Sequence, residues 1–157
     1  MRKRILSSPA PGETTVNHDW LDLDRLAQVE ISSEDPDYPI ESALSTAAGP
    51  GWRAADAGEQ TIRILFDEPA RLRHLRLLFE EPKRSRTQEF VLRWSADGGK
   101  TFREVVRQQF NFSPPDATRE EESYSVELEG VTTLELRIVP DIAGGMEKAS
   151  LGLLRLA

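Results

Sequence analysis

The sequence predicts an all-β protein, a jelly-roll β-sandwich of about eight antiparallel strands, and three observations lead to this prediction. Short stretches alternate apolar and polar residues with a period of two, which is typical of half-buried strands. Turn-forming residues separate these stretches at short intervals. No convincing long helix interrupts them, and 157 residues are enough for one domain with one core.

The central part of the chain, residues 52–94, contains three of these stretches. Ile62, Ile64 and Phe66 share one face of the first, and residues 67–69, Asp-Glu-Pro, are predicted to end it. A helical reading of residues 71–79 stays open because they are rich in leucine and arginine, although the spacing favours a strand. The next two stretches place apolar residues at every second position: Leu75, Leu77 and Phe79, then Phe90, Leu92 and Trp94.

The N-terminal quarter predicts an arm, one strand and irregular chain. Residues 1–24, broken by prolines and a glycine, are predicted to pack on a domain formed by residues 25–157, and a first strand is expected at 26–32. The anchors of the arm would be Trp20, Leu21 and Leu23, and packing is favoured over ligand stacking for Trp20. Prolines at positions 36 and 39 exclude a central strand, so residues 40–44 can form at most about one helical turn.

The C-terminal part predicts further hairpins. Ala-Asp-Gly-Gly at 96–99 is a strong turn signal, because aspartate and glycine tolerate hairpin backbone angles. A strand at 101–110 and a long loop at 111–123 should follow. Gly130 is predicted to turn between two strands, and a loop at 141–148 precedes the last strand. These later strands are expected at residues 124–128, 134–138 and 149–156.

The composition limits the function classes. The net charge of −7 repels nucleic acid and anionic lipid, and the chain has no cysteine for disulfides or thiolate metal sites. The cluster of Lys83, Arg84 and Arg86 is interpreted as a solvated loop in preference to a phosphate site. No membrane-spanning run and no export signal are recognisable, so we expect a soluble, cytoplasmic protein.

The sequence contains few of the residues and motifs that catalysis requires. The two histidines, His18 and His74, are predicted to lie in the arm and on a strand surface. No nucleophile, phosphate-loop or zinc motif occurs. The acidic run at 120–122 is predicted to be solvated in preference to binding a metal. We therefore expect a protein that is not an enzyme and that uses no cofactor.

Five segments in order over residues 27–157 resemble discoidin-like domains, the coagulation-factor type C domains of the galactose-binding-like fold. They are SSEDPDYPIESAL, Trp52 after a short loop, LFDEP, FVLRWSADGGKTFREV and SLGLLRL. The resemblance implies this fold and a ligand site in the loops at one end of the sandwich. Many relatives hold calcium through an acidic loop residue and a glutamate in the last strand. Here STAAGPG has no acid and Leu153 takes the glutamate position, so no metal is expected.

WRAADAGEQTI also resembles a segment in the N-terminal domain of the X-ray repair cross-complementing scaffold protein, which has the same fold and binds broken DNA. The requirements of folding alone can explain that match, because Trp52 would pack at the end of the sandwich and Gly58 would form the turn before the next strand.

Together these observations predict a non-catalytic ligand-binding module. Carbohydrate is the leading ligand, held by loop residues that supply aromatic surface and hydrogen bonds. A protein or nucleic-acid interaction module like the repair-scaffold domain is the alternative, although the net charge disfavours nucleic acid and nothing indicates a membrane. A protein partner stays open. The predicted ligand-binding residues are Tyr38, Glu81, Arg84, Arg86, Phe110, Asn111 and Phe112.

Overall fold

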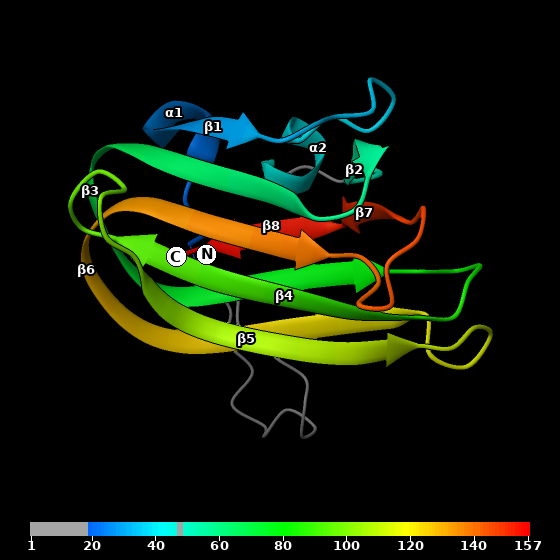
Figure 1. Cartoon of the computed structure of the whole chain (residues 1–157). Helices are drawn as coiled ribbons and strands as arrows, with labels where there is room; N and C mark the ends of the chain where they lie inside the picture. The colour runs from blue at the N-terminus through cyan, green and yellow to red at the C-terminus, as the bar shows by residue number, and fades with distance from the viewer. Residues whose placement is uncertain (1–18, 47–48) are drawn as a thin grey trace, which may run out of the picture.

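The computed structural model describes residues 19–46 and 49–157, which form eight strands and two one-turn helices (Figure 1). The all-β prediction is confirmed. In chain order the elements are α1 (Leu23–Leu26), β1 (Ala27–Ile31), α2 (Glu41–Leu44), β2 (Trp52–Ala57), β3 (Gln60–Glu80), β4 (Arg86–Ser95), β5 (Arg103–Phe112), β6 (Arg119–Val139), β7 (Lys148–Leu151) and β8 (Leu153–Leu156).

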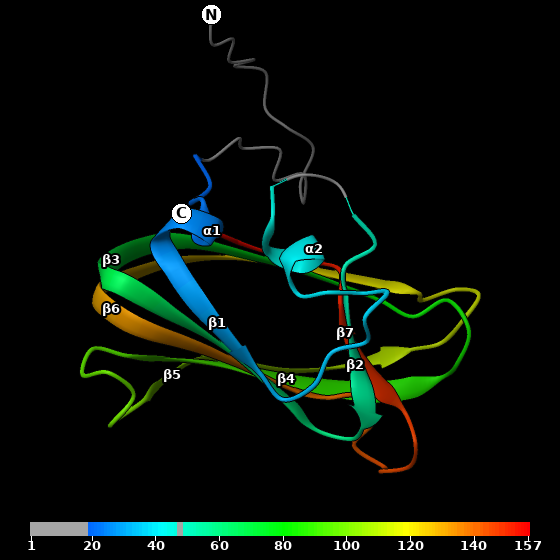
Figure 2. The same cartoon turned by 90° about the horizontal axis from the view of Figure 1, so that it is seen from above.

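Two long strands, β3 and β6, build both layers of the sandwich. Each has 21 residues, and they pair antiparallel over almost their whole length. The first half of β3 also pairs with β1, and its second half pairs with β8. The second half of β6 pairs with β4, which pairs with β5. One layer is therefore β1-β3-β6-β4-β5 and the other is β8-β3-β6, while β2 and β7 form a small separate sheet (Figures 1 and 2).

The predicted turns inside these two strands are wrong. Residues 67–69 bend β3 without ending it, because the pairing with β6 resumes at Ala70 after a shift in register. Pro69 is tolerated there since it lies between the paired residues Leu65 and Ala70 and needs to donate no ladder hydrogen bond. Gly130 takes a positive φ of 69° at the matching bend of β6. The ribbon thus passes from one layer to the other at the left of Figures 1 and 2.

The core lies between the two layers and contains the alternating apolar residues of the predicted strands. Phe79 and Phe90, from opposite layers, stack with ring centroids 5.2 Å apart. Trp52 is 1% exposed, and its indole N–H donates to the carbonyl of Ser33 at 3.2 Å. The prediction that Trp52 packs in the sandwich is confirmed.

Strand boundaries differ from the prediction after residue 110. β5 continues to Phe112 and β6 begins at Arg119, so the connecting loop is only 113–118. The extension follows the inward alternation of Phe110 and Phe112 against the core. The last predicted strand is split at Gly152, where an added Cβ would lie 3.1 Å from the carbonyl oxygen of Leu78.

The N-terminal arm is described only from residue 19, so residues 1–18, His18 included, lie outside the described part of the chain. Leu23 is buried, and the amide of Leu21 donates to the carbonyl of Leu156 at 2.7 Å. The division at residue 24 stays a prediction. Neither helix in residues 19–46 and 49–157 is long and apolar enough to cross a membrane.

The burial of Trp52 gives a stability test. Trp52→Ala should lower the free energy of unfolding by about 3–5 kcal/mol, because it removes a fully buried large aromatic side chain. Denaturant unfolding monitored by circular dichroism measures this loss. Arg53→Ala, at the adjacent exposed position, is the matched control and should change stability little. An unfolding midpoint that is the same for Trp52→Ala and the native chain would contradict the packing of Trp52.

Candidate functional site

A pocket of about 220 Å³ lies at the loop end of the sandwich. The loops that follow β3, β5 and β6 all lie at this end, at the right of Figure 1. The small β2–β7 sheet forms part of the wall, because Trp52 and Arg53 at the start of β2 pair with Leu151 and Ser150 at the end of β7. The lining residues are Tyr38, Pro50, Trp52, Arg53, Glu80, Pro82, Thr118, Ser150, Leu151 and Gly152.

Tyr38 and Arg53 form a stacked pair in this pocket. The guanidinium carbon of Arg53 lies 4.5 Å from the centre of the Tyr38 ring, which is cation–π geometry. Arg53 is exposed and Tyr38 is half-buried. The strand period explains the arrangement, since Trp52 points into the core and its neighbour Arg53 must point the other way. The pair presents a planar surface beside hydrogen-bond donors.

Backbone hydrogen bonds hold this pair in place. The amide of Arg53 donates to the carbonyl of Tyr38 at 3.2 Å, and the carbonyl of Arg53 accepts from the amide of Asp35 at 2.8 Å. The 35–38 turn is closed by the amide of Tyr38 donating to the carbonyl of Asp35 at 2.8 Å. A side-chain bond from the Asp37 amide to Asp35 Oδ1, at 2.9 Å, supports the turn. The loop that carries Tyr38 is thus tied to the strand that carries Arg53.

The other polar groups of the pocket complement Arg53. Glu80 provides a carboxylate acceptor, and Thr118 and Ser150 provide hydroxyl groups. Such a mixed lining suits a small ligand with several hydroxyl groups. Within residues 19–46 and 49–157, no group of three or more histidine, aspartate or glutamate side chains could hold a metal ion.

Arg86, a predicted ligand-binding residue, is buried at the loop end. Its side chain is 2% exposed, and its Nε donates to Glu81 Oε1 at 2.8 Å. Its Nη1 donates to the carbonyl of Pro140 and to Gln88 Oε1, both at 2.6 Å. Burial opposes ionisation of Glu81, but the hydrogen bond and charge of Arg86, together with the backbone amides of Lys83 and Arg84, lower the pKa of that carboxyl. Arg86 therefore joins the loops after β3 and β6, and its Nε and Nη1 donors are occupied within the protein.

Phe112, another predicted ligand-binding residue, is 2% exposed, so its ring offers no open stacking surface. It packs edge-on against Phe110 with ring centroids 5.1 Å apart, and the guanidinium of Arg86 lies 4.8 Å from its ring centre. Phe110 contacts the core phenylalanines Phe79 and Phe90. Both rings point inward because β5 continues through them.

The remaining predicted residues are spread over the loop end. Arg84 is exposed and pairs with Glu147 at 3.0 Å. Asn111 is exposed and accepts a hydrogen bond from Thr87 Oγ1 at 2.5 Å. Of the seven predicted ligand-binding residues, Tyr38 alone lines the pocket, although Glu81 lies between the lining residues Glu80 and Pro82.

Sequence reasoning missed Arg53, Thr118 and Ser150 as pocket residues. Only Arg53 carried a usable signal, because it directly follows a tryptophan that was predicted to point inward. Thr118 and Ser150 reach the pocket through pairings that the local pattern does not encode. Ser150, for example, lies opposite Arg53 across the β2–β7 register.

Comparison with known proteins shows the fold of the chain. No protein-family model matches the sequence, and no curated protein matches it. Solved structures do match. The family 32 carbohydrate-binding module from C. perfringens NanJ, in complex with galactose, has a TM-score of 0.63 at 10% identity, over 87% of this chain and 96% of that one.

Two further structures have the same architecture. A family 32 module from Clostridium perfringens, in complex with GalNAc-β-1,3-galactose, gives a TM-score of 0.64 at 16% identity, covering 87% of this chain and 98% of the other. The F5/8 type C domain of a Bacteroides fragilis protein gives 0.59 at 13% identity, covering 87% and 93%. The chain therefore has the discoidin-like, galactose-binding-like fold that its sequence resemblance implied.

A pair of carboxyl groups lies near the start of β6, where the sequence predicted a solvated loop or the entry to a strand. Burial raises the pKa of Glu120 to about 7, and a hydrogen bond to Glu122 and the charge of Glu122 add to the rise. The hydroxyl of Tyr124 donates to Glu122 Oε2 at 3.1 Å. The period of the strand explains the cluster, since residues 120, 122 and 124 share one half-buried face.

This carboxyl pair gives a pH test. The folded-state pKa of Glu120 lies above the ordinary value of 4.5, so the folded protein holds this proton more tightly than the unfolded chain. The free energy of unfolding should therefore fall as pH rises from 4.5 through about 7. Glu120→Gln should reduce that fall, as measured by denaturant unfolding at several pH values. Glu121→Gln, which removes the ion pair with Arg76 and keeps the carboxyl pair, should retain it. Equal pH dependence in the native chain and Glu120→Gln would refute the assignment.

Proposed function

We propose that this protein is a non-catalytic carbohydrate-binding module that holds a sugar in the loop-end pocket of Tyr38 and Arg53. The observation that carries the proposal is the stacked Tyr38–Arg53 pair in a polar pocket of about 220 Å³. The similarity in fold to modules solved with galactose and with GalNAc-β-1,3-galactose supports it. The volume lies below the roughly 300–1,000 Å³ of drug-sized sites, which suits one small ligand unit.

The chemistry of the pocket fits a neutral sugar. Arg53 covers one face of the Tyr38 ring, so the C–H face of a pyranose would pack against the remaining surface of the ring, and Arg53 donates hydrogen bonds without accepting any. Glu80 accepts hydrogen bonds from hydroxyl groups. One cation and one carboxylate in the same lining match neighbouring hydroxyls that both donate and accept. Because the 35–38 turn is already bonded to β2, little ordering should be required when a ligand binds.

The proposal predicts which substitutions abolish binding. Tyr38→Ala and Arg53→Ala should each weaken the binding of galactose or N-acetylgalactosamine by about tenfold or more, measured by calorimetry or by ligand-observed NMR. Tyr38→Phe, which keeps the ring, should retain most of the affinity. Arg53→Ala should leave the fold intact because Arg53 is exposed.

Asn111→Ala separates this pocket from the other predicted location. Asn111 is exposed but does not line the pocket, so its substitution should leave sugar binding unchanged. Loss of binding in Asn111→Ala, with full binding in Tyr38→Ala, would place the ligand near β5 and reject the Tyr38–Arg53 pocket. No binding of any sugar in a broad glycan panel would reject the proposed function itself.

Salt dependence distinguishes a sugar from DNA. Affinity for a neutral sugar should hardly change with salt, whereas each neutralised phosphate adds about −0.9 to the slope of log affinity against log salt. The net charge of −7 disfavours DNA, and Arg84 and Arg86 at the loop end are both paired with glutamates. We expect at most weak binding to nicked duplex DNA at physiological salt in a mobility-shift assay. Tight binding there, abolished by Arg84→Glu, would support the repair-scaffold alternative.

A further inference from the structure

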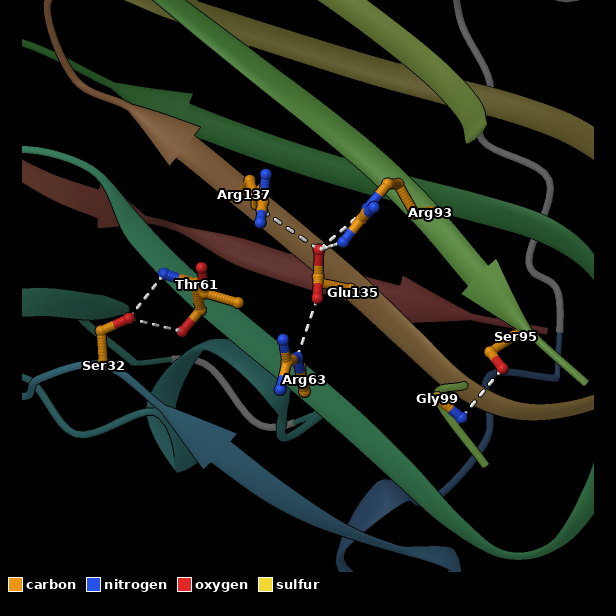
Figure 3. A network of polar contacts seen from close by, with 8 residues as sticks. All are labelled: Ser32, Thr61, Arg63, Arg93, Ser95, Gly99, Glu135 and Arg137. Atoms are coloured by element: carbon orange, nitrogen blue, oxygen red, sulfur yellow. Dashed lines mark hydrogen bonds and ion pairs between the residues drawn. The ribbon is translucent and has the colours of Figure 1, made fainter. Parts of the chain in front are cut away.

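The outward face of the five-stranded layer carries a buried carboxylate surrounded by arginines (Figure 3). Glu135, on β6, is 0% exposed although its side chain points away from the core. Arg63 on β3 and Arg93 on β4 lie directly opposite it in the two adjacent strands, and Arg137 is two positions along β6. The three guanidinium groups cover Glu135, which explains its burial on an outer sheet face.

The contacts within this cluster leave guanidinium donors available. Arg63 Nε donates to Glu135 Oε2 at 2.8 Å, and Arg137 Nε lies 3.3 Å from Glu135 Oε1. Arg93 donates to Oε1 through Nε at 2.9 Å and Nη2 at 2.5 Å. Among the residues that the structure describes, no hydrogen bond or ion pair engages the terminal nitrogens of Arg63 or Arg137. Their side chains are 43% and 44% exposed.

The charges of the cluster do not balance. Burial opposes ionisation of Glu135, but the hydrogen bonds and the charges of Arg63 and Arg93 together lower its pKa, so the carboxylate is charged at neutral pH. Three guanidinium groups therefore share the one negative charge of Glu135, which leaves an excess of two positive charges within these four groups, while Glu30 and Glu104 lie opposite Arg63 and Arg93 at the edges of the cluster. Arg93 is further fixed by stacking 4.5 Å from the centre of the Phe102 ring. A carboxylate from a binding partner would therefore meet guanidinium donors that are already held in position.

Two hollows flank the cluster on the same face. One, of about 100 Å³, is lined by Arg93, Arg107 and Arg137 together with valines 91 and 139 and glutamates 59 and 89. The other, lined by Glu30, Ile31, Ser32, Thr61 and Arg63, is an open depression between β1 and β3. The face thus combines a cationic centre, two depressions and some apolar surface.

Glutamates surround the arginine cluster, and their charge indicates which kind of partner would fit this face. Glu30, Glu59 and Glu89 line the hollows, and Glu104 lies opposite Arg93 in the register of β4 and β5. Arg107, which bonds Glu89 and Glu104, is locally neutralised. A uniform polyanion such as nucleic acid would meet these glutamates around the cationic centre and be repelled. A protein surface with one carboxylate between basic side chains has the complementary pattern.

We propose that this sheet face is a docking surface for a protein partner that places a carboxylate among Arg63, Arg93 and Arg137 and basic side chains against the surrounding glutamates. The surface goes beyond the sugar pocket and shares no residue with it. Charge-assisted bonds between guanidinium and carboxylate groups are stronger than neutral ones, and a planar guanidinium can engage both oxygens. The carboxylate would thereby reduce the charge excess of the cluster.

The test uses the full chain and two synthetic peptides, acetyl-Lys-Thr-Glu-Thr-Lys-amide and its counterpart with a central glutamine. Proton–nitrogen NMR of the arginine Nε–H groups reports the cluster directly. The glutamate peptide should shift the signals of Arg63, Arg93 and Arg137 saturably, with about tenfold tighter binding than the glutamine peptide. Arg137→Gln should weaken it, while Glu135 keeps two arginine partners in that variant. Arg119→Gln, an exposed arginine on the first half of β6, is the matched control and should bind normally.

Several outcomes would overturn this proposal. Equal binding of the two peptides, or no saturable shift at millimolar peptide, would show that the cluster does not recognise a carboxylate. Tighter binding of heparin or duplex DNA, with shifts of the same arginine signals, would show that the face prefers a polyanion over a protein. Arg107 lines the hollow without contacting Glu135. The substitution Arg107→Gln therefore tests the surface if Arg137→Gln does not fold. Unchanged peptide binding in both Arg137→Gln and Arg107→Gln would show that the peptide binds elsewhere on the protein.

Discussion

The continuous pairing of β3 with β6 through a shared bend is the constraint on which the rest of the structure depends. Each strand contributes one half to each layer, so the two layers are covalently joined and hydrogen-bonded at the bend. The bend requires a shift in register, which removes Pro69 from the ladder, and a residue that accepts positive φ, which Gly130 supplies. With one end of the sandwich closed by this ribbon, the loops after β3, β5 and β6 gather at the other end.

Buried polar contacts fix that loop end. Arg86 is hydrogen-bonded to Glu81 on one loop and to the carbonyl of Pro140 on another, and it lies against Phe112. Burying a guanidinium is costly unless its donors are satisfied, and here the carboxylate and the carbonyl satisfy them. Trp52 supports the same end by packing in the core beneath Arg53. The Tyr38–Arg53 pocket is therefore built on residues whose own positions are determined by packing, which is the requirement for a preformed site.

The sequence predicted the fold class and the inward faces of most strands because alternation records which side chains leave water. It did not predict that residues 61–66 and 75–79 belong to one strand. Asp-Glu-Pro is an ordinary turn signal, and only the pairing with β6 shows that the chain bends there without ending the strand. The same limit applies to the site. Arg86 and Phe112 were expected in ligand-binding loops, but burial depends on which strands lie opposite, and that information is non-local. Arg53 reaches Tyr38 through a similar long-range contact.

The two proposed surfaces share no residue, and in strand β4 the outward side chains of the proposed docking face are separate from the inward side chains that support the loop end. Arg86, Gln88, Phe90 and Leu92 of β4 point inward, where they anchor the loop end and fill the core, whereas Glu89, Val91 and Arg93 point outward. A substitution on the outward face changes the surface around Glu135 and leaves the inward contacts of the same strand in place. Tyr38 and Arg53 come from other elements, so the pocket does not use β4 directly. The proposed ligand at the loop end and the proposed protein partner across the sheet would therefore contact separate residues of one domain.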